Sequence, residues 1–130
     1  MRHVLAVIAA VAACMLLVVA CHKAGFASLP ERHGTPFTQY LTSCVSWPFA
    51  AVWLLAAGAL GAVSRSPWGV AAGMTLPLVI ATVIEVARDP TSHNLLGIEV
   101  ALFWVPLLLL ALGAARVGNR MRARMETRAA

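Results

Sequence analysis

The sequence predicts an all-α integral membrane protein, a four-helix bundle, and three observations predict it. Four long runs carry no Asp, Glu, Lys or Arg, namely 4–21, 34–64, 66–84 and 100–115. Hydrophobic residues make up 61% of the 130-residue chain and charged residues only 12%, against about 25% charged in soluble domains. The charges are confined to the segments before, between and after the runs. Because a helix needs about 20 mostly apolar residues to cross a bilayer, each run supplies one crossing.

The basic residues predict that both termini lie in the cytoplasm. In that orientation the inner side carries Arg2, Arg65, Arg116, Arg120, Arg122, Arg124 and Arg128, and the outer side carries Lys23, Arg32 and Arg88. The positive-inside rule favours this imbalance. The formal net charge of +5 is therefore an orientation signal, and no docking motif or aromatic platform supports nucleic-acid binding. The abundance of Arg, Ala, Val and Leu is common in proteins of GC-rich bacterial genomes, so we expect a multi-pass protein of the bacterial inner membrane.

The first helix is expected at about 4–21 and carries a face of small residues. Ala6, Ala10 and Cys14 are spaced by four, so they lie on one side of the helix. Small side chains let a neighbouring helix approach closely within a membrane. We therefore expect a helix–helix contact along this face.

The second and third helices are expected at about 47–64 and 67–88. The short polar segment around Arg65 predicts a tight inner turn that joins them as an antiparallel hairpin. In the third helix, Gly69 and Gly73 form a GxxxG pattern, which favours close helix packing.

The fourth helix is expected at about 95–117, followed by a basic cytoplasmic tail at 116–130. An arginine recurs at every fourth position from 116 to 128, beside an apolar stripe of Val117, Met121 and Met125. We expect anionic lipid to contact the arginines of this tail, which are Arg116, Arg120, Arg122, Arg124 and Arg128. A plain orientation signal or a docking helix for a cytoplasmic partner are the alternative interpretations, and Gly118 weakens a helix in either case.

The first segment has a second interpretation. Residues 18–21, Val-Val-Ala-Cys, look like the cleavage site of a lipoprotein signal, in which lipid is attached to Cys21. The mature chain would then begin at Cys21 and keep three helices. The apolar run is longer than the 7–15 residues usual in a signal-peptide core, which favours a retained helix.

Two cysteines are expected near the outer ends of the first two helices. In an oxidising periplasm, a disulfide between Cys21 and Cys44 would clamp the outer loop. Two unpaired, partly buried thiols are the alternative. No CxxC motif is present to indicate thiol-redox chemistry or haem attachment.

The segment 85–99 concentrates ionisable groups. Three of the five acidic residues and one of the four histidines fall within it: Glu85, Asp89, His93 and Glu99. Glu85 and Asp89 are four apart at the negative end of the third helix dipole, where carboxylates are unfavourable. Glu99 lies about one turn into the fourth helix, and ionisable residues inside a membrane are costly and are functional candidates.

These four side chains are candidate ligands for a divalent cation, or candidate carriers of a proton. Carboxylates and imidazole are suitable ligand types, although the spacing matches no established ligand motif. Ordinary turn and helix-cap chemistry accounts for Asp89 and the three polar residues Thr91, Ser92 and Asn94 equally well. Both interpretations stay open, and the sequence predicts no cofactor.

Residues 89–95, Asp-Pro-Thr-Ser-His-Asn-Leu, followed by Glu99, resemble a loop of small, uncharacterised bacterial four-helix membrane proteins. The resemblance covers about a tenth of the chain. It implies that this loop is a working surface, and it implies no activity.

Three classes of function remain. Short loops, small-residue faces and the lack of a catalytic signature favour an accessory or interaction subunit of a larger membrane assembly, and no enzyme activity is predicted. A proton- or cation-coupled small transporter using 85–99 is the alternative, although small four-helix multidrug carriers place a carboxylate in a first helix that is uncharged here. A membrane enzyme similar in size to the glutathione-linked four-helix family comes third, because that family's Arg-rich loops have no match. The expected partners are the lipid bilayer and either a membrane protein or a second copy of this chain.

Overall fold

The computed structural model describes residues 1–24, 47–88 and 104–129. These residues form four helices: α1 (Arg2–Lys23), α3 (Trp47–Ser64), α4 (Pro67–Arg88) and α6 (Val105–Ala129). The described ranges contain no strand. The predicted all-α class is therefore confirmed for this part of the chain.

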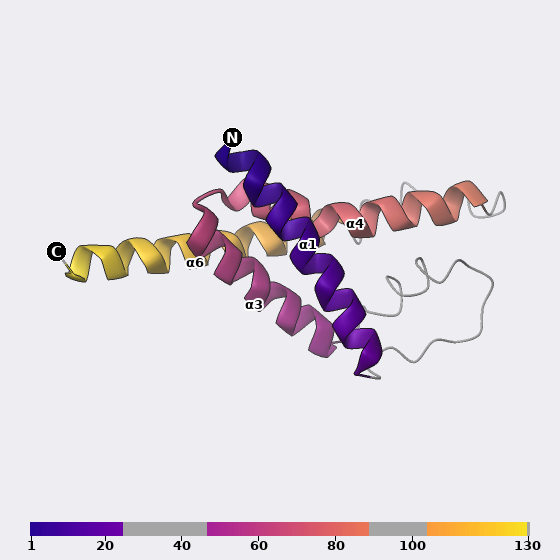
Figure 1. Cartoon of the computed structure of the whole chain (residues 1–130), viewed down its shortest axis with the longest axis horizontal. Helices are drawn as coiled ribbons and strands as arrows, with labels where there is room; N and C mark the ends of the chain where they lie inside the picture. The colour runs from indigo at the N-terminus through magenta and orange to yellow at the C-terminus, as the bar shows by residue number, and fades with distance from the viewer. Residues whose placement is uncertain (25–46, 89–103, 130) are drawn as a thin grey trace.

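Each helix packs mainly against a helix that is not its neighbour in the sequence. Helix α1 contacts chiefly α4, and α3 contacts chiefly α6, whereas α3 and α4 touch far less although a short turn joins them. In Figure 1, α4 and α6 lie behind α1 and α3 and extend in opposite directions. The second and third helices are therefore joined by the expected tight turn, but they diverge from it instead of packing along their length as a hairpin.

The α1–α4 contact is built from small residues. Ala6, Ala10 and Cys14 are all buried, which confirms the predicted face of α1. A Cβ atom added to Gly69 would lie 3.2 Å from the Ala6 Cβ, and one added to Gly73 would lie 2.7 Å from the Ala10 Cβ. The GxxxG pattern therefore brings α4 close to α1. The residue numbers rise together from the Ala6–Gly69 pair to the Ala10–Gly73 pair, so the two helices run parallel.

The α3–α6 contact brings backbone against backbone. A Cβ added to Gly61 would collide with the backbone of Ala115, and one added to Gly118 would collide with the carbonyl group of Gly58. The residue numbers rise together from the contact of Gly58 with Ala114 to the bond between Ala62 and Arg122, so α3 and α6 run parallel. Gly118, expected to weaken a helix, is needed here for close approach, and α6 continues through it to Ala129.

The core holds few large side chains. Trp53, Met74 and Val70 are the largest that are fully buried, together with Cys14. Many aliphatic side chains point outward instead, with exposed fractions of 71% at Leu16, 73% at Leu55 and 74% at Val63. Small residues therefore occupy the helix contacts, and large aliphatic residues form much of the surface.

One described helix is long and apolar enough to cross a membrane, over the 20 residues Arg2–Cys21. The apolar stretches Phe49–Ser64 and Pro67–Ile80 are shorter than that criterion requires. A signal sequence or the core helix of a soluble protein can meet the same criterion of length and composition. Residues 95–103, the expected start of the fourth crossing, lie outside the described residues.

Candidate functional site

The structure describes only the beginning of the predicted ionisable segment. Glu85 lies in the last turn of α4, and its side chain is outside the described part, as are Asp89, His93 and Glu99. Among the described residues, no three His, Cys, Asp or Glu side chains gather as metal ligands do. The predicted cation or proton site therefore stays a prediction.

The predicted disulfide is likewise untested. Cys21 is half-buried in the last turn of α1, and Cys44 lies outside the described residues. Cys14 is buried on the face of α1 that contacts α4, which is the packing role the sequence predicts for it.

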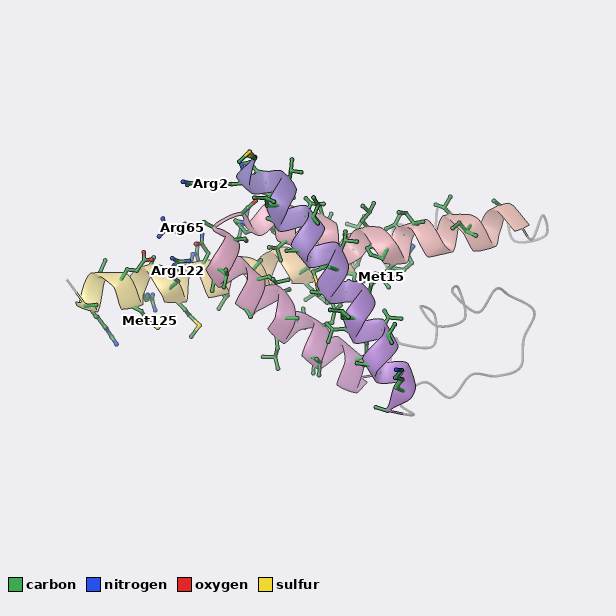
Figure 2. The ribbon with its side chains drawn as sticks, in the orientation of Figure 1. Arg2, Met15, Arg65, Arg122 and Met125 are labelled. Atoms are coloured by element: carbon green, nitrogen blue, oxygen red, sulfur yellow. The ribbon has the colours of Figure 1, made fainter. Side chains whose placement is uncertain are left out.

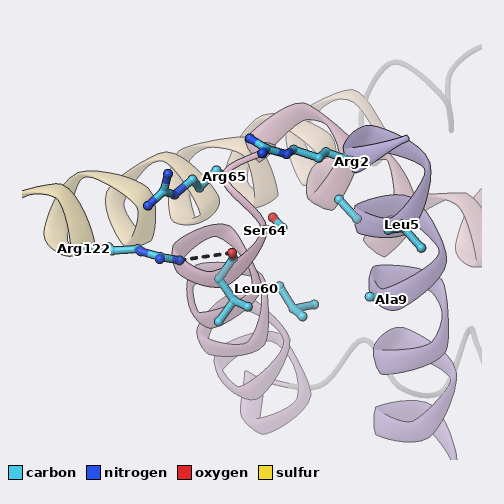
Figure 3. Close-up of a pocket in the computed structure, with 9 residues that line it drawn as sticks. Arg2, Leu5, Ala9, Leu60, Ser64, Arg65 and Arg122 are labelled. Atoms are coloured by element: carbon cyan, nitrogen blue, oxygen red, sulfur yellow. Dashed lines mark hydrogen bonds between the residues drawn. The ribbon is translucent and has the colours of Figure 1, made fainter. Parts of the chain in front are cut away.

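The described part of the chain instead brings arginines from three distant segments to one end of the molecule. Arg2 begins α1, Arg65 lies in the turn after α3, and Arg122 lies in α6 (Figure 2). They border an open groove of about 440 Å³ between α1 and α3 (Figure 3). The groove is lined by Arg2, Leu5, Ala6, Ala9, Leu60, Val63, Ser64, Arg65 and Arg122.

Arg122 caps the C-terminus of α3. Its Nη1 donates hydrogen bonds to the carbonyl oxygens of Ala62, at 2.9 Å, and Val63, at 3.2 Å. The last carbonyl groups of a helix have no partner within the helix, and they form the negative end of its dipole. A guanidinium group at this position therefore stabilises α3 and holds α6 against it. Figure 3 draws the bond to Val63 as a dashed line.

Glu126 links the tail of α6 to the turn between α3 and α4. Its Oε1 accepts a hydrogen bond from the Nε of Arg122 at 2.8 Å and another from the Nη2 of Arg65 at 3.0 Å. The hydrogen bond from Arg122, with a smaller contribution from the charge of Arg65, holds the pKa of Glu126 below its ordinary value. The carboxylate therefore stays ionised, and it fixes two of the three arginines at the groove.

Arg65 occupies a backbone conformation that non-glycine residues rarely adopt. Its φ is 55°, in the left-handed region, where an L-residue costs roughly 1–2 kcal/mol. A residue in this conformation commonly follows the C-terminus of a helix, and it is usually Gly or Asn. The arginine at position 65 places a guanidinium group at the groove, and a glycine at this position would lack that group.

Two further contacts join pairs of helices at the same end. The Nδ1 of His3 lies 2.7 Å from the Oγ of the buried Ser66, so the start of α1 is bonded to the start of α4. The guanidinium of Arg116 lies 5.6 Å from the centroid of the Trp68 ring, a cation–π contact between α6 and α4. Each described helix therefore has a specific partner at the arginine-bearing end.

The arginines of the tail do not act as one group. Arg120, Arg124 and Arg128 are exposed, while Arg122 is bonded to α3. The sequence carried a signal for this difference, because Arg122 falls outside the every-fourth-residue stripe. It lies instead on the face of the small residues Ala111, Ala115 and Gly118, and that face packs on α3.

No protein-family model, no curated protein and no solved structure matches the chain. Residues 89–95, which carry the resemblance to small bacterial membrane proteins, lie outside the described residues.

Proposed function

We propose that this protein is a multi-pass bundle of the bacterial inner membrane that acts as an accessory or interaction subunit of a larger membrane assembly. The observation that carries the proposal is the distribution of side-chain sizes. Alanine and glycine fill the helix contacts, and long aliphatic side chains project outward from all four described helices.

This distribution is stable in lipid and unfavourable in water. In water, exposed aliphatic side chains such as Leu16, Leu55 and Leu109 would form large apolar patches, which soluble monomers avoid. Lipid tails are as apolar as leucine, so helix association in a membrane depends on close packing of small residues. The apolar stretches Phe49–Ser64 of α3 and Pro67–Ile80 of α4 cover about 24 and 21 Å at 1.5 Å per residue, and the flanking turns of each helix extend them toward a hydrocarbon core of about 30 Å.

Helix α1 offers the surface for a protein partner. Val4, Ile8 and Leu16 are exposed on α1, and Ala12 is exposed between them. Residues four apart share a face of a helix, so these side chains form one apolar ridge. A partner helix can pack on this ridge while the opposite face of α1 is covered by α4.

The test is photo-crosslinking in the native membrane. A benzoylphenylalanine residue at position 16 is expected to yield one adduct of constant mass, and the same residue at position 109 on α6 serves as the matched exposed control. Native mass spectrometry of the gently extracted protein then gives the partner's stoichiometry, and a partner mass of 13.7 kDa identifies a second copy of the chain. Adducts with lipid alone at both positions would contradict the proposed role.

A transporter would respond differently to loss of its carboxylates. An accessory subunit should keep its crosslinked partner when Glu85 or Glu99 is replaced by Gln. A cation- or proton-coupled carrier should lose ion flux in reconstituted vesicles with the same substitutions. Retained crosslinking together with no ion flux in the wild-type protein supports the accessory role.

A further inference from the structure

We propose that the groove between α1 and α3 binds one anionic phospholipid, with its phosphate at the arginines and an acyl chain along the groove. The proposal rests on the multi-pass arrangement proposed above, in which the arginine-bearing end faces the cytoplasmic leaflet. It concerns the groove itself, which is distinct from the exposed stripe of the α6 tail.

The groove has a net positive charge, which favours an anionic ligand. Arg65 and Arg122 share a single carboxylate, that of Glu126. Arg2 has no hydrogen bond or ion pair within the described ranges, although its side chain lines the groove. Three guanidinium groups balanced by one carboxylate leave an excess of positive charge. A guanidinium group binds phosphate oxygens through two parallel hydrogen bonds, so a phosphate group satisfies Arg2 well.

The lining changes from cationic to aliphatic along the groove. Arg2 and Arg65 lie at its end, and Leu5, Ala9 and Leu60 form its walls (Figure 3). Ala9 is seven residues beyond Arg2, which places it about 10 Å further along α1. A phospholipid in the adjoining leaflet has the same order of groups, with the phosphate outermost and the acyl chain deeper. A free phosphate ion would use only the arginines and leave the aliphatic walls uncovered.

The shape of the groove separates it from a general basic surface. Its volume of about 440 Å³ is within the range of roughly 300–1,000 Å³ found for small-molecule sites. Arg120, Arg124 and Arg128 are exposed on α6 and attract anionic lipid at roughly 1 kcal/mol each without holding one molecule. The groove combines a fixed pair of arginines with apolar walls, so it retains a single lipid.

The experiment is a lipid titration of the purified full-length chain in a neutral detergent, followed by native mass spectrometry. The probes are phosphatidylglycerol, phosphatidylcholine and, as a soluble headgroup, glycerol 3-phosphate. Two variants alter the groove: Ala9→Phe fills it without changing the charge, and Arg2→Gln removes a cation. Their matched controls are Ala12→Phe, at an exposed alanine of α1 that does not line the groove, and Arg120→Gln on α6.

The wild-type chain is expected to retain one phosphatidylglycerol in preference to phosphatidylcholine. Ala9→Phe and Arg2→Gln are each expected to weaken that binding by about tenfold, as expected when charge-assisted bonds or buried apolar contacts are lost. Ala12→Phe is expected to bind as the wild type does, and Arg120→Gln is expected to lose clearly less binding than Arg2→Gln. Far-ultraviolet circular dichroism of each variant shows that the helices are intact.

Three results would overturn the assignment. An equal loss in Arg120→Gln would show that the α6 surface, and not the groove, attracts the lipid. Unchanged binding in Ala9→Phe would remove the groove as the place of the acyl chain. Competition by glycerol 3-phosphate at the same concentration as phosphatidylglycerol would identify a phosphate site without an acyl contact.

The proposed lipid site and the proposed accessory role can each be disproved without disproving the other. The titration uses the purified chain alone, whereas the crosslinking experiment detects a protein partner in the native membrane. If lipid binding is lost in none of the variants while the crosslinked partner persists, only the groove assignment is wrong. If no partner is found but Ala9→Phe still loses its lipid, only the accessory role is wrong.

Discussion

The two parallel helix pairs use small residues in different ways. In the α1–α4 pair, glycines occur on α4 alone, and Gly73 faces the carbonyl of Val7 and the Cβ of Ala10. In the α3–α6 pair, glycines occur on both helices, so Gly118 lies directly against the backbone of Gly58. The first pair is joined by a hydrogen bond between the His3 ring and the Ser66 hydroxyl, and the second by hydrogen bonds from a guanidinium group to backbone carbonyls.

The difference shows which contact depends more strictly on the sequence. At the α1–α4 contact, a Cβ added to Gly73 would meet the Ala10 Cβ as well as the backbone of Val7. At the α3–α6 contact every close atom is backbone and the overlap is larger, so an added Cβ requires a larger movement of a whole helix, because close-packed interiors have no spare volume. We therefore expect the α3–α6 pair to tolerate substitution less well than the α1–α4 pair.

The largest expected effect is at Gly118. Gly118→Ala should lower the free energy of unfolding by about 1–3 kcal/mol or more, because the new Cβ collides with the carbonyl of Gly58. Gly113→Ala on the same helix is the matched control, since a Cβ there meets nothing within 4 Å. That control should raise stability by up to about 1 kcal/mol through helix propensity. Thermal unfolding in one detergent, followed by circular dichroism, compares the two, and equal shifts would contradict the close α3–α6 contact.

A smaller loss is expected at Gly73. Gly73→Ala should cost about 1–2 kcal/mol, because its Cβ would lie 2.7 Å from the Ala10 Cβ and 2.5 Å from the Val7 carbonyl oxygen. Adding Ala10→Gly should restore part of the loss by removing one of these contacts. The measurement is a double-mutant cycle on thermal stability, and a coupling of at least about 0.5 kcal/mol is expected. Strictly additive effects would show that the two residues are not in contact.

Removal of the cap should have a moderate effect. Arg122→Gln is expected to cost about 1 kcal/mol, because two carbonyl groups of α3 lose a charged donor. The side chain of Arg122 is 35% exposed, so its ion pair with Glu126 adds little. Arg124→Gln, at an exposed position of α6, is the control and should be neutral. Faster amide hydrogen exchange in the last turn of α3 should accompany Arg122→Gln alone.

The pH dependence of this junction follows from Glu126. Its pKa is lower in the folded chain than the ordinary 4.5, so its contribution to stability is present above that value and is lost as the pH falls through the lowered pKa. We therefore expect the contacts of Arg65 and Arg122 with Glu126 to be unchanged around neutral pH. Glu126→Gln should remove the acid-dependent part of the unfolding curve, and a curve that keeps it would assign that part to another group.

The smallest effect is expected at the turn that joins the two pairs. Arg65→Gly relieves a left-handed backbone conformation, worth roughly 1 kcal/mol. It also removes an exposed ion pair with Glu126, which is worth a few tenths of a kcal/mol at most such sites. The net result should be a slight gain in thermal stability. A loss of stability would show that the ion pair outweighs the backbone strain.

Local geometry explains which parts of the fold could be predicted. The spacing of Ala6 and Ala10, and of Gly69 and Gly73, depends only on the helix period, so the contact faces of α1 and α4 follow from the sequence. The helices α3 and α4 occupy the predicted ranges 47–64 and 67–88, because the uncharged runs and the polar turn around Arg65 are also local features of the sequence. The choice of partner is not a local property, and the pairing of α1 with α4 could not be derived from periodicity.

Tertiary contacts explain the rest. In an isolated helix Gly118 is destabilising, and its close approach to Gly58 outweighs that cost here. The last helix extends to Ala129 instead of ending near 117, because Arg122 and Glu126 bond its tail to the α3–α4 junction. The groove needs three segments to meet, and no spacing in the sequence indicates that meeting. The site predicted at 85–99 and the bridge to Cys44 stay predictions.

The pairing of non-neighbouring helices has a consequence for how the chain is made. A ribosome completes α1 long before α4 exists, and it completes α3 before α6 has begun. Both early helices therefore leave synthesis with their small-residue faces uncovered. Gly58 and Gly61 of α3 can contact α6 only after the last segment of the chain has emerged, so the native arrangement forms when translation is nearly finished. In a chain that stops before residue 105, Gly58 and Gly61 would be accessible to any other helix that carries a face of small residues. Correct packing of this protein therefore depends on its final helix.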